Sequence, residues 1–378
     1  MMFTVVTNPS TAAHDAVGVP RSVEAGNAIA LLTGRQFHVS GVNMRGEAPL
    51  IRASAGGAFL VGENASKYIP QIRQNNPGLP LIVEPRAMRK HWATASEPFK
   101  GNGRDNAFEL SLDAELDWQR MDSDLAITPT GQIRAGDSAA LKAALREVNQ
   151  LDRCDVLFSL PLSGAWLNND QYVKQIIAVI NRSRHPVLLA FTGSGNPVGS
   201  VKRAKYYRRI FSEATVPVVA YRTDLIGFDA LAHGALASAI GSYPSLRRLT
   251  AVDGRGFAMD PEVKSPHMLL TDMLRFVRST HMRREWFAGV KPIQCFCIVC
   301  GGADLDRLHG SEAERRLGHN HNVVAVDNLY SSYVSVDTLS KRALWARQTA
   351  GALDTYPQLE SHLGRPLKID PLLEYWAA

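Results

Sequence analysis

Three closely spaced cysteines near residue 300 are the residues whose types and spacing most clearly predict chemistry. Cys295, Cys297 and Cys300 form the pattern C-x-C-x-x-C within the segment IQCFCIVCGG. One tight loop can direct three thiolates with this spacing at a common point, and Zn²⁺ prefers four tetrahedral sulfur or nitrogen ligands. Gly301 and Gly302 follow directly and let the chain turn away sharply. The segment therefore predicts a zinc site that needs one more ligand.

A histidine downstream of the cysteines can supply the fourth ligand. His309, His319 and His321 all follow the cluster. Side chains two residues apart on a helix point in different directions, so only one of the last two is expected to bind, and we favour His321. Four filled positions predict a closed structural site rather than a catalytic one. Buried core thiols or redox chemistry remain the alternatives, and Cys154 is expected to be an ordinary buried cysteine.

Short apolar runs that alternate with helical patterns must position these residues. Such alternation is typical of βα units and a parallel sheet. Helices are predicted near 138–151, 170–181 and 202–211. Seven strands are predicted, at FLVG (59–62), LPLIVEP (79–85), SDLAITPTG (123–131), DVLFSLPLS (155–163), HPVLLAFTGSG (185–195), VPVVAYRTD (216–224) and ALASAIGS (235–242).

Seven strands are close to the eight of an α/β (β/α)8 TIM-like barrel, here with a C-terminal zinc-binding subdomain. The missing strand is expected at RRLTAVDG or in the cysteine segment. A doubly wound open sheet has the same local pattern. We expect a β-rich prelude at 1–58, the barrel at 59–290, the zinc segment at 291–330 with a helix near 268–287 before it, and a helical closing segment at 331–378.

Polar residues directly after the predicted strands are the candidates for function, because barrel enzymes place their active sites at the carboxyl ends of the strands. The best candidates for catalysis are Glu84 and Asp224, and Arg222 is placed beside Asp224. Asp224 could instead cap the next helix. The wider set comprises Arg86, Thr128, Thr130, Ser159, Ser163, Thr192, Ser194 and Ser242.

Charge and composition indicate what the chain could bind. The net charge is +6 over 378 residues, with basic clusters at 202–209, 247–248, 283–284 and 315–316. Such clusters could neutralise phosphates of a nucleic acid, or they could be solvated helix faces. No apolar run is long enough to span a bilayer and no secretory leader is evident, so we expect a cytoplasmic protein without a membrane partner.

The zinc segment and the predicted barrel together resemble the tRNA-guanine transglycosylases and their DNA-modifying relatives. The resemblance is carried by C-x-C-x-x-C, by the pair His321-Asn322, and by HGALASAIGSYPSLRR (233–248). It implies exchange of guanine or a 7-deazaguanine in tRNA or DNA through a covalent intermediate. It also implies a homodimer, or a heterodimer with a catalytic subunit.

Several residues depart from the pattern that this family implies. Gly241 stands where the aspartate nucleophile is expected, and Glu84 stands in an early turn that lacks the family's glycines. Thr192, Gly193 and Ser194 keep a small substrate-binding turn without the amide that grips the base. Glu84 and Asp224 are then the remaining candidates for acid, base or nucleophile.

Three functions are therefore open. The chain could be a divergent base-exchange enzyme that uses Glu84 and Asp224. It could be a catalytically inactive zinc-containing barrel subunit that binds nucleic acid or a catalytic partner. It could also be a barrel enzyme that acts on a small metabolite, with the zinc site unrelated to that activity.

Overall fold

Eight parallel strands form the centre of the computed structural model, which describes residues 26–101, 111–193, 195–254 and 264–378. The strands are β1 (Gln36–Ser40), β2 (Gly56–Leu60), β3 (Leu81–Val83), β4 (Ala126–Ile127), β5 (Val156–Ser163), β6 (Val187–Thr192), β7 (Val218–Thr223) and β8 (Ala237–Gly241). Their order is β3-β2-β1-β8-β7-β6-β5-β4. Because β1 pairs with β8, the sheet curls into the predicted barrel rather than a doubly wound open sheet.

The barrel begins earlier than predicted. The eighth strand is β1, within RQFHVSG, and neither RRLTAVDG nor the cysteine segment supplies it. The expected boundary at residue 59 therefore cuts through β2, and much of the expected prelude belongs to the barrel. The run QFHVS is buried on both faces, but Gln36, His38 and Ser40 are polar, so it lacks the continuous apolar run expected of a strand in a parallel barrel.

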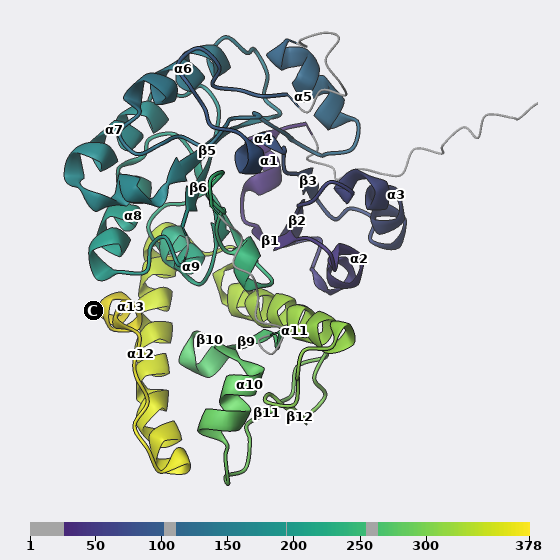
Figure 1. Ribbon diagram of the computed structural model, residues 1–378, viewed down its shortest axis with the longest axis vertical. Coiled ribbons are helices and arrows are strands. Elements are labelled where there is room, and N and C mark those ends of the chain that lie inside the picture. Colours follow the sequence, from purple (N-terminus) through teal and green to yellow (C-terminus); the bar gives the residue numbers. More distant parts are fainter. Residues whose placement is uncertain (1–25, 102–110, 194, 255–263) are drawn as a thin grey trace, which may run out of the picture.

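Helices surround the barrel and follow the strands in the expected alternation (Figure 1). Those beside the barrel are α1 (Ala28–Leu32), α2 (Met44–Glu47), α3 (Ala65–Asn75), α4 (Ala87–Lys90), α5 (Leu112–Arg120), α6 (Ser138–Val148), α7 (Asp170–Ile180), α8 (Val201–Glu213) and α9 (Ile226–Ala232). Side-chain caps fix several starts: Asp137 accepts from Ala140 N, Asn169 from Tyr172 N, and Ser200 from Arg203 N. The predictions for α6, α7 and α8 are confirmed to within a few residues.

Apolar side chains fill the inside of the barrel. Phe37, Phe59, Leu157, Leu188 and Tyr221 belong to one fully buried cluster that draws on opposite strands. The barrel is thus a packed core and not a channel.

The barrel closes between β3 and β4 through side chains as well as backbone. Asp124 N donates to Leu81 O at 2.8 Å, and the Asp124 carboxylate accepts from Leu81 N at 2.8 Å. Ser123 Oγ accepts from Val83 N at 3.0 Å. Arg73 neutralises the buried Asp124 at 3.0 Å, so this carboxylate of the seam is paired.

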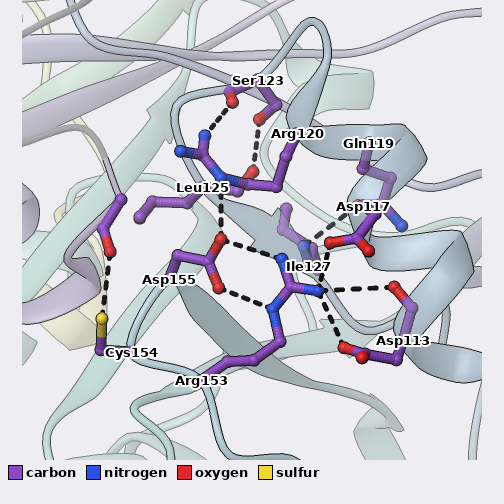
Figure 2. Close-up of polar contacts among 11 residues, drawn as sticks. Asp113, Asp117, Gln119, Arg120, Ser123, Leu125, Ile127, Arg153, Cys154 and Asp155 are labelled. Atoms are coloured by element: carbon purple, nitrogen blue, oxygen red, sulfur yellow. Dashed lines mark hydrogen bonds and ion pairs between the residues drawn. The ribbon is translucent and has the colours of Figure 1, made fainter.

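A network of charges joins α5 to the amino ends of β4 and β5 (Figure 2). Arg153 contacts Asp113, Asp117 and Asp155 at 2.6 to 2.9 Å. Arg120 also pairs with Asp155, at 2.9 Å. The neighbouring Cys154 is exposed, and its thiol donates to Gly26 O at 3.3 Å, so the prediction of a buried cysteine was wrong. The strand becomes buried only at Val156, two residues later.

The described residues of the C-terminal region pack under the barrel as two short hairpins and four α-helices (Figure 1). They are β9 (His267–Leu270), β10 (Arg275–Arg278), α10 (Ser279–His281), β11 (Gln294–Cys295), β12 (Ala303–Asp304), α11 (Glu312–Tyr330), α12 (Thr338–Leu363) and α13 (Pro371–Ala377). The helix expected at 268–287 is instead the β9–β10 hairpin followed by short helical turns. Leu274 adopts φ 47° at the hairpin turn, which no α-helix permits.

Buried side chains of this region merge with the core outside the barrel. Trp345 on α12 stacks on Phe228 of α9 at 5.8 Å, and Trp345 Nε1 donates to the buried Asp229 at 3.2 Å. Among the helices formed by described residues, none combines the length and apolar character needed to cross a bilayer.

Candidate metal centre and the strand-end face of the barrel

Cys295, Cys297, Cys300 and His321 converge on one point. The three Sγ atoms lie 3.5, 3.5 and 3.4 Å from His321 Nδ1, and all four possible ligand atoms lie within 4.8 Å of one another. The cysteines come from β11 and the turn before β12, whereas the histidine comes from the middle of α11. This Cys3His cluster could hold a metal ion.

Backbone geometry explains why the three thiols face inward. Gly301 N and Cys300 N both donate to Cys297 O, and Gly302 N donates to Cys295 O. Gly301 and Gly302 have φ of 59° and 90°, which favours glycine at both positions. The expected sharp turn after the last cysteine is confirmed.

His321 is held in the orientation that a ligand needs. Its Nε2 donates to Leu269 O at 2.9 Å, so the proton lies on Nε2 and Nδ1 presents a lone pair to the thiols. His319 points elsewhere: its ring stacks on Tyr243 at 4.6 Å. The choice of His321 over His319 for the cluster is therefore confirmed.

Asn322, beside the histidine, joins the metal helix to the barrel. Its side chain accepts from Leu269 N at 2.8 Å and donates to His267 O at 2.7 Å and Ser242 O at 2.8 Å. In the His-Asn pair, His321 thus belongs to the metal cluster and Asn322 connects α11 to the end of β8.

Glu84, a predicted catalytic residue, is buried in an ion-pair network. Arg222 donates to its two oxygens at 2.6 and 2.8 Å, Tyr221 OH donates at 2.6 Å, and Arg89 lies 3.0 Å away. Burial alone would raise the pKa of Glu84, but Arg222, Arg89 and Tyr221 outweigh it and hold that pKa below its usual value. Glu84 is consequently a charged group whose hydrogen-bonding capacity is used within the protein.

The chain after β8 covers the carboxyl ends of the strands. We call residues 244–252 the covering segment. Leu246 and Leu249 are buried in the barrel core, and Arg222 donates to the carbonyl oxygens of Ser245 and Arg248, both at 3.3 Å. Arg222 reaches them from a left-handed conformation, φ 53°, that is uncommon outside glycine. The predicted substrate-binding arginine therefore holds this segment in place.

The predicted substrate-binding turn after β6 contacts the same segment. Thr192 is buried and bridges Leu249, while Gly193 N donates to Leu249 O at 3.1 Å and Leu249 N donates to Phe191 O at 3.1 Å. Ser194 lies outside the described residues. The backbone of this turn therefore pairs with the covering segment.

Gly241 lies at the end of β8, directly under the covering segment. A Cβ at this position would lie 2.4 Å from Leu246 C and 2.7 Å from Arg247 N. The obstacle is backbone, which a side chain cannot displace cheaply. A carboxylate nucleophile therefore has no space at residue 241.

Asp224 lies at the rim of the barrel, separate from the ion pair of Glu84. Its carboxylate accepts from Asn196 Nδ2 at 2.8 Å and from Ile226 N, the first residue of α9, at 3.0 Å. This contact at the helix start is close to the alternative prediction, although the N-cap position itself is Leu225. Burial raises its pKa. Among the described residues, no hydrogen bond or ion pair joins Asp224 to Glu84, so the two predicted catalytic carboxylates do not form a pair.

Much of the basic cluster on α8 is neutralised within the protein. Arg208 pairs with Asp229 at 2.7 Å, and Arg209 pairs with Asp170 and Glu213. Arg316 is likewise paired, with Glu312. These contacts weaken the expectation that α8 is a nucleic-acid-binding stripe.

A buried carboxyl that the sequence did not single out lies between β1, β8 and α11. Glu47 accepts from Ser40 Oγ and from Ser242 Oγ, the latter at 3.0 Å, and His319 Nδ1 is 3.9 Å away. Burial raises the pKa of Glu47 to about 7, because the serine hydrogen bonds compensate only in part. The strand-end pattern did select Ser242, which contacts Glu47, so Ser242 was the one sequence feature that pointed to this cluster.

Comparisons with known proteins show no family. No protein-family model and no curated protein matches the chain. Two solved structures that do match are the carboxyl transferase domain of Rhizobium etli pyruvate carboxylase with 3-bromopyruvate (11% identity, TM-score 0.35) and with 3-hydroxypyruvate (10% identity, TM-score 0.34). The matches cover 98% and 95% of this chain but only 62% and 60% of the solved chains.

Proposed function

We propose that this chain is a zinc-containing barrel, similar to the tRNA-guanine transglycosylases, that acts as a catalytically inactive binding subunit. The observation that carries the proposal is the covering segment over the strand ends, with no space for a carboxylate at Gly241. An enzyme that extrudes and replaces a base needs an open pocket and a nucleophile at this face. Here the polar groups at that face contact one another.

Zinc is the metal that the cluster fits best. Tetrahedral zinc with bonds of about 2.3 Å to sulfur and about 2.0 Å to nitrogen places each sulfur about 3.5 Å from the nitrogen. The observed separations of 3.4 to 3.5 Å agree with that geometry. Three protein thiolates and one imidazole would complete the coordination, so zinc would stabilise the fold here and would not activate water.

A protein partner is supported by the surface beside the cluster. Phe296 and Ile298, between the metal-ligating cysteines, are 80% and 85% exposed. Apolar side chains so exposed are expected at protein interfaces. A nucleic-acid partner has less support, because acidic residues neutralise much of α8. Four free cysteines fit a reducing compartment such as the cytoplasm.

Base exchange by the isolated chain is the decisive test. Purified protein would be incubated with labelled guanine or 7-deazaguanine and either tRNA or duplex DNA, beside an active transglycosylase as positive control. We expect no incorporation by this chain alone. Incorporation that is lost in Glu84→Ala and Asp224→Ala would overturn the proposal and restore the enzyme hypothesis.

A further inference from the structure

A cleft of about 360 Å³ lies where the rim of the barrel meets the C-terminal region. Asp224, Arg247 and Arg248 line it from the barrel side, and Arg275 and Trp376 line it from the hairpin and α13. Its volume falls within the range of small-molecule sites, about 300 to 1,000 Å³. The cleft borders the carboxyl ends of β6 and β7, the end where barrels bind their ligands.

Three arginines line this cleft, and none of them makes an ion pair with a described residue. Arg247 is fixed by its own contacts: Nε donates to Gly241 O at 3.0 Å, Nη2 donates to Ser242 O at 3.2 Å, and the guanidinium lies 3.3 Å above the Phe276 ring. Arg275 donates to Lys368 O at 2.9 Å. Arg247 and Arg275 are therefore held in place by neutral groups.

Unpaired cations in a partly enclosed site favour an anion. Burial lowers the pKa of Arg247 to about 9, and the charge of Asp224 opposes this shift only in part. Asp224 and Asp370 also line the cleft, but each already accepts a backbone N–H at a helix start. Three arginines against two aspartates leave an excess positive charge that a bound anion would neutralise.

The remaining walls are suited to an organic group. Leu372, Leu373 and Trp376 of α13 line the cleft with apolar side chains. Asp224, whose pKa burial raises, can meet a hydroxyl or amine of a ligand near the arginines. The cleft therefore combines cationic side chains with an apolar surface from α13.

We propose that this cleft binds a small organic phosphate, with the phosphate on Arg247, Arg248 and Arg275 and the organic part against α13. A phosphate offers three acceptor oxygens and up to two negative charges, so it can accept from several guanidinium groups at once, which a ligand carboxylate does less completely. The inference does not depend on whether base exchange is absent.

Two substitutions test the cleft from different sides. Arg248→Gln removes one cation whose side chain has no hydrogen bond to a described residue. Gly195 lines the cleft with nothing within 4 Å of its Cβ position, so Gly195→Trp would fill the space without disturbing the barrel. Arg146→Gln, on the exposed side of α6, is the matched control for loss of one positive charge.

Calorimetry in phosphate-free buffer would compare adenosine monophosphate, glucose phosphate, inorganic phosphate, adenosine and a short single-stranded oligonucleotide. We expect at least one organic phosphate to bind more tightly than adenosine and inorganic phosphate. Arg248→Gln should weaken that binding about tenfold or more, since the phosphate would lose a hydrogen bond to a charged group. Gly195→Trp should abolish it, and Arg146→Gln should leave it unchanged.

The proposal is overturned if no organic phosphate binds at millimolar concentration, or if adenosine binds as tightly as its monophosphate. Binding of the oligonucleotide alone would also overturn it, in favour of a nucleic-acid surface. Circular dichroism must show wild-type folding for each variant. If Arg248→Gln unfolds the protein, the binding measured with Gly195→Trp tests the proposal instead. Unchanged binding in a folded Gly195→Trp protein would then count against the site.

Discussion

Buried charges at the strand ends follow one rule: each is either paired or held by several hydrogen bonds. Glu84 has two arginines and a tyrosine, whereas Glu47 has serine hydroxyls and no arginine. The pKa of Glu84 is therefore lowered, and the pKa of Glu47 is raised to about 7. These opposite shifts predict opposite dependences of stability on pH.

Replacing Glu84 by glutamine should destabilise the protein strongly. The change leaves Arg222 buried without its counterion, and breaking one partner of a buried pair costs about 3 to 5 kcal/mol. Because the folded pKa of Glu84 is lowered, its contribution is present at neutral pH and is lost as pH falls below the usual glutamate value of 4.5. Urea denaturation at neutral and acidic pH would measure both effects.

Glu63 provides the control for that experiment. It pairs with Arg86 at 3.3 Å, and both side chains are more than half exposed. Glu63→Gln should change stability by less than about 1 kcal/mol. An equal loss in Glu63→Gln and Glu84→Gln would contradict a special role for the buried pair.

Glu47→Gln should flatten the stability profile between pH 4.5 and 7. The folded pKa exceeds the unfolded one, so the folded state retains a proton in this window and wild-type stability falls as pH rises. Glutamine stays neutral, so relative to wild type the variant should gain up to about 3 kcal/mol across the window. Denaturation midpoints at several pH values would test this, and parallel profiles for variant and wild type would refute it.

At the scale of elements, α11 has the central role. It carries His321 for the metal cluster, Asn322 for the contact with β8 and β9, and a Ser311–Glu314 capping box at its start. The two hairpins of the C-terminal region are too short to be stable alone. A metal bound to α11 and β11 would supply the missing stabilisation.

Loss of one metal ligand should therefore be visible both in zinc content and in stability. We expect about one zinc per wild-type chain, and far less in Cys300→Ala and His321→Ala, with a lower melting temperature. Cys154→Ala and His319→Ala should retain the metal, because neither residue is in the cluster. Elemental analysis and thermal melts would show this. Full zinc content in His321→Ala would disprove the assignment.

At the scale of the whole molecule, the C-terminal region and the barrel share one core. Residues of α6 to α9, β9, β10, α12 and α13 belong to a single buried cluster that includes Cys300. Residues on both sides of the predicted boundaries at 290 and 330 belong to this one cluster, so the boundaries do not separate independent cores. The described residues of both parts should consequently unfold together.

Trp345→Ala tests that coupling. Trp345 is 2% exposed and contacts Phe228, Asp229 and Trp376, so truncation should cost about 3 to 5 kcal/mol. Hydrogen exchange should increase in β7 and β8 as well as in α12. Trp118→Ala, at a site 46% exposed, should cost much less. Exchange confined to α12 would show that the C-terminal region unfolds separately.

The sequence alone determined the features that depend on local spacing. Apolar runs of five or six residues predict strands wherever they recur, and C-x-C-x-x-C with a later histidine predicts a metal cluster, because both signals require only neighbouring residues. β1 was not predicted as a strand because Gln36, His38 and Ser40 are polar although they are buried, so the segment contains no continuous apolar run.

Only the tertiary structure decided what the strand-end residues do. Glu84, Arg222 and Thr192 are at the predicted face. Arg222 pairs with Glu84, and Arg222 and Thr192 contact the covering segment, which no local pattern links to them. In an open pocket Glu84 would be a candidate for catalysis. Here its role is structural, because Arg222 pairs with it and also donates to a carbonyl oxygen of the covering segment. That outcome depends on long-range packing, which residue spacing does not encode.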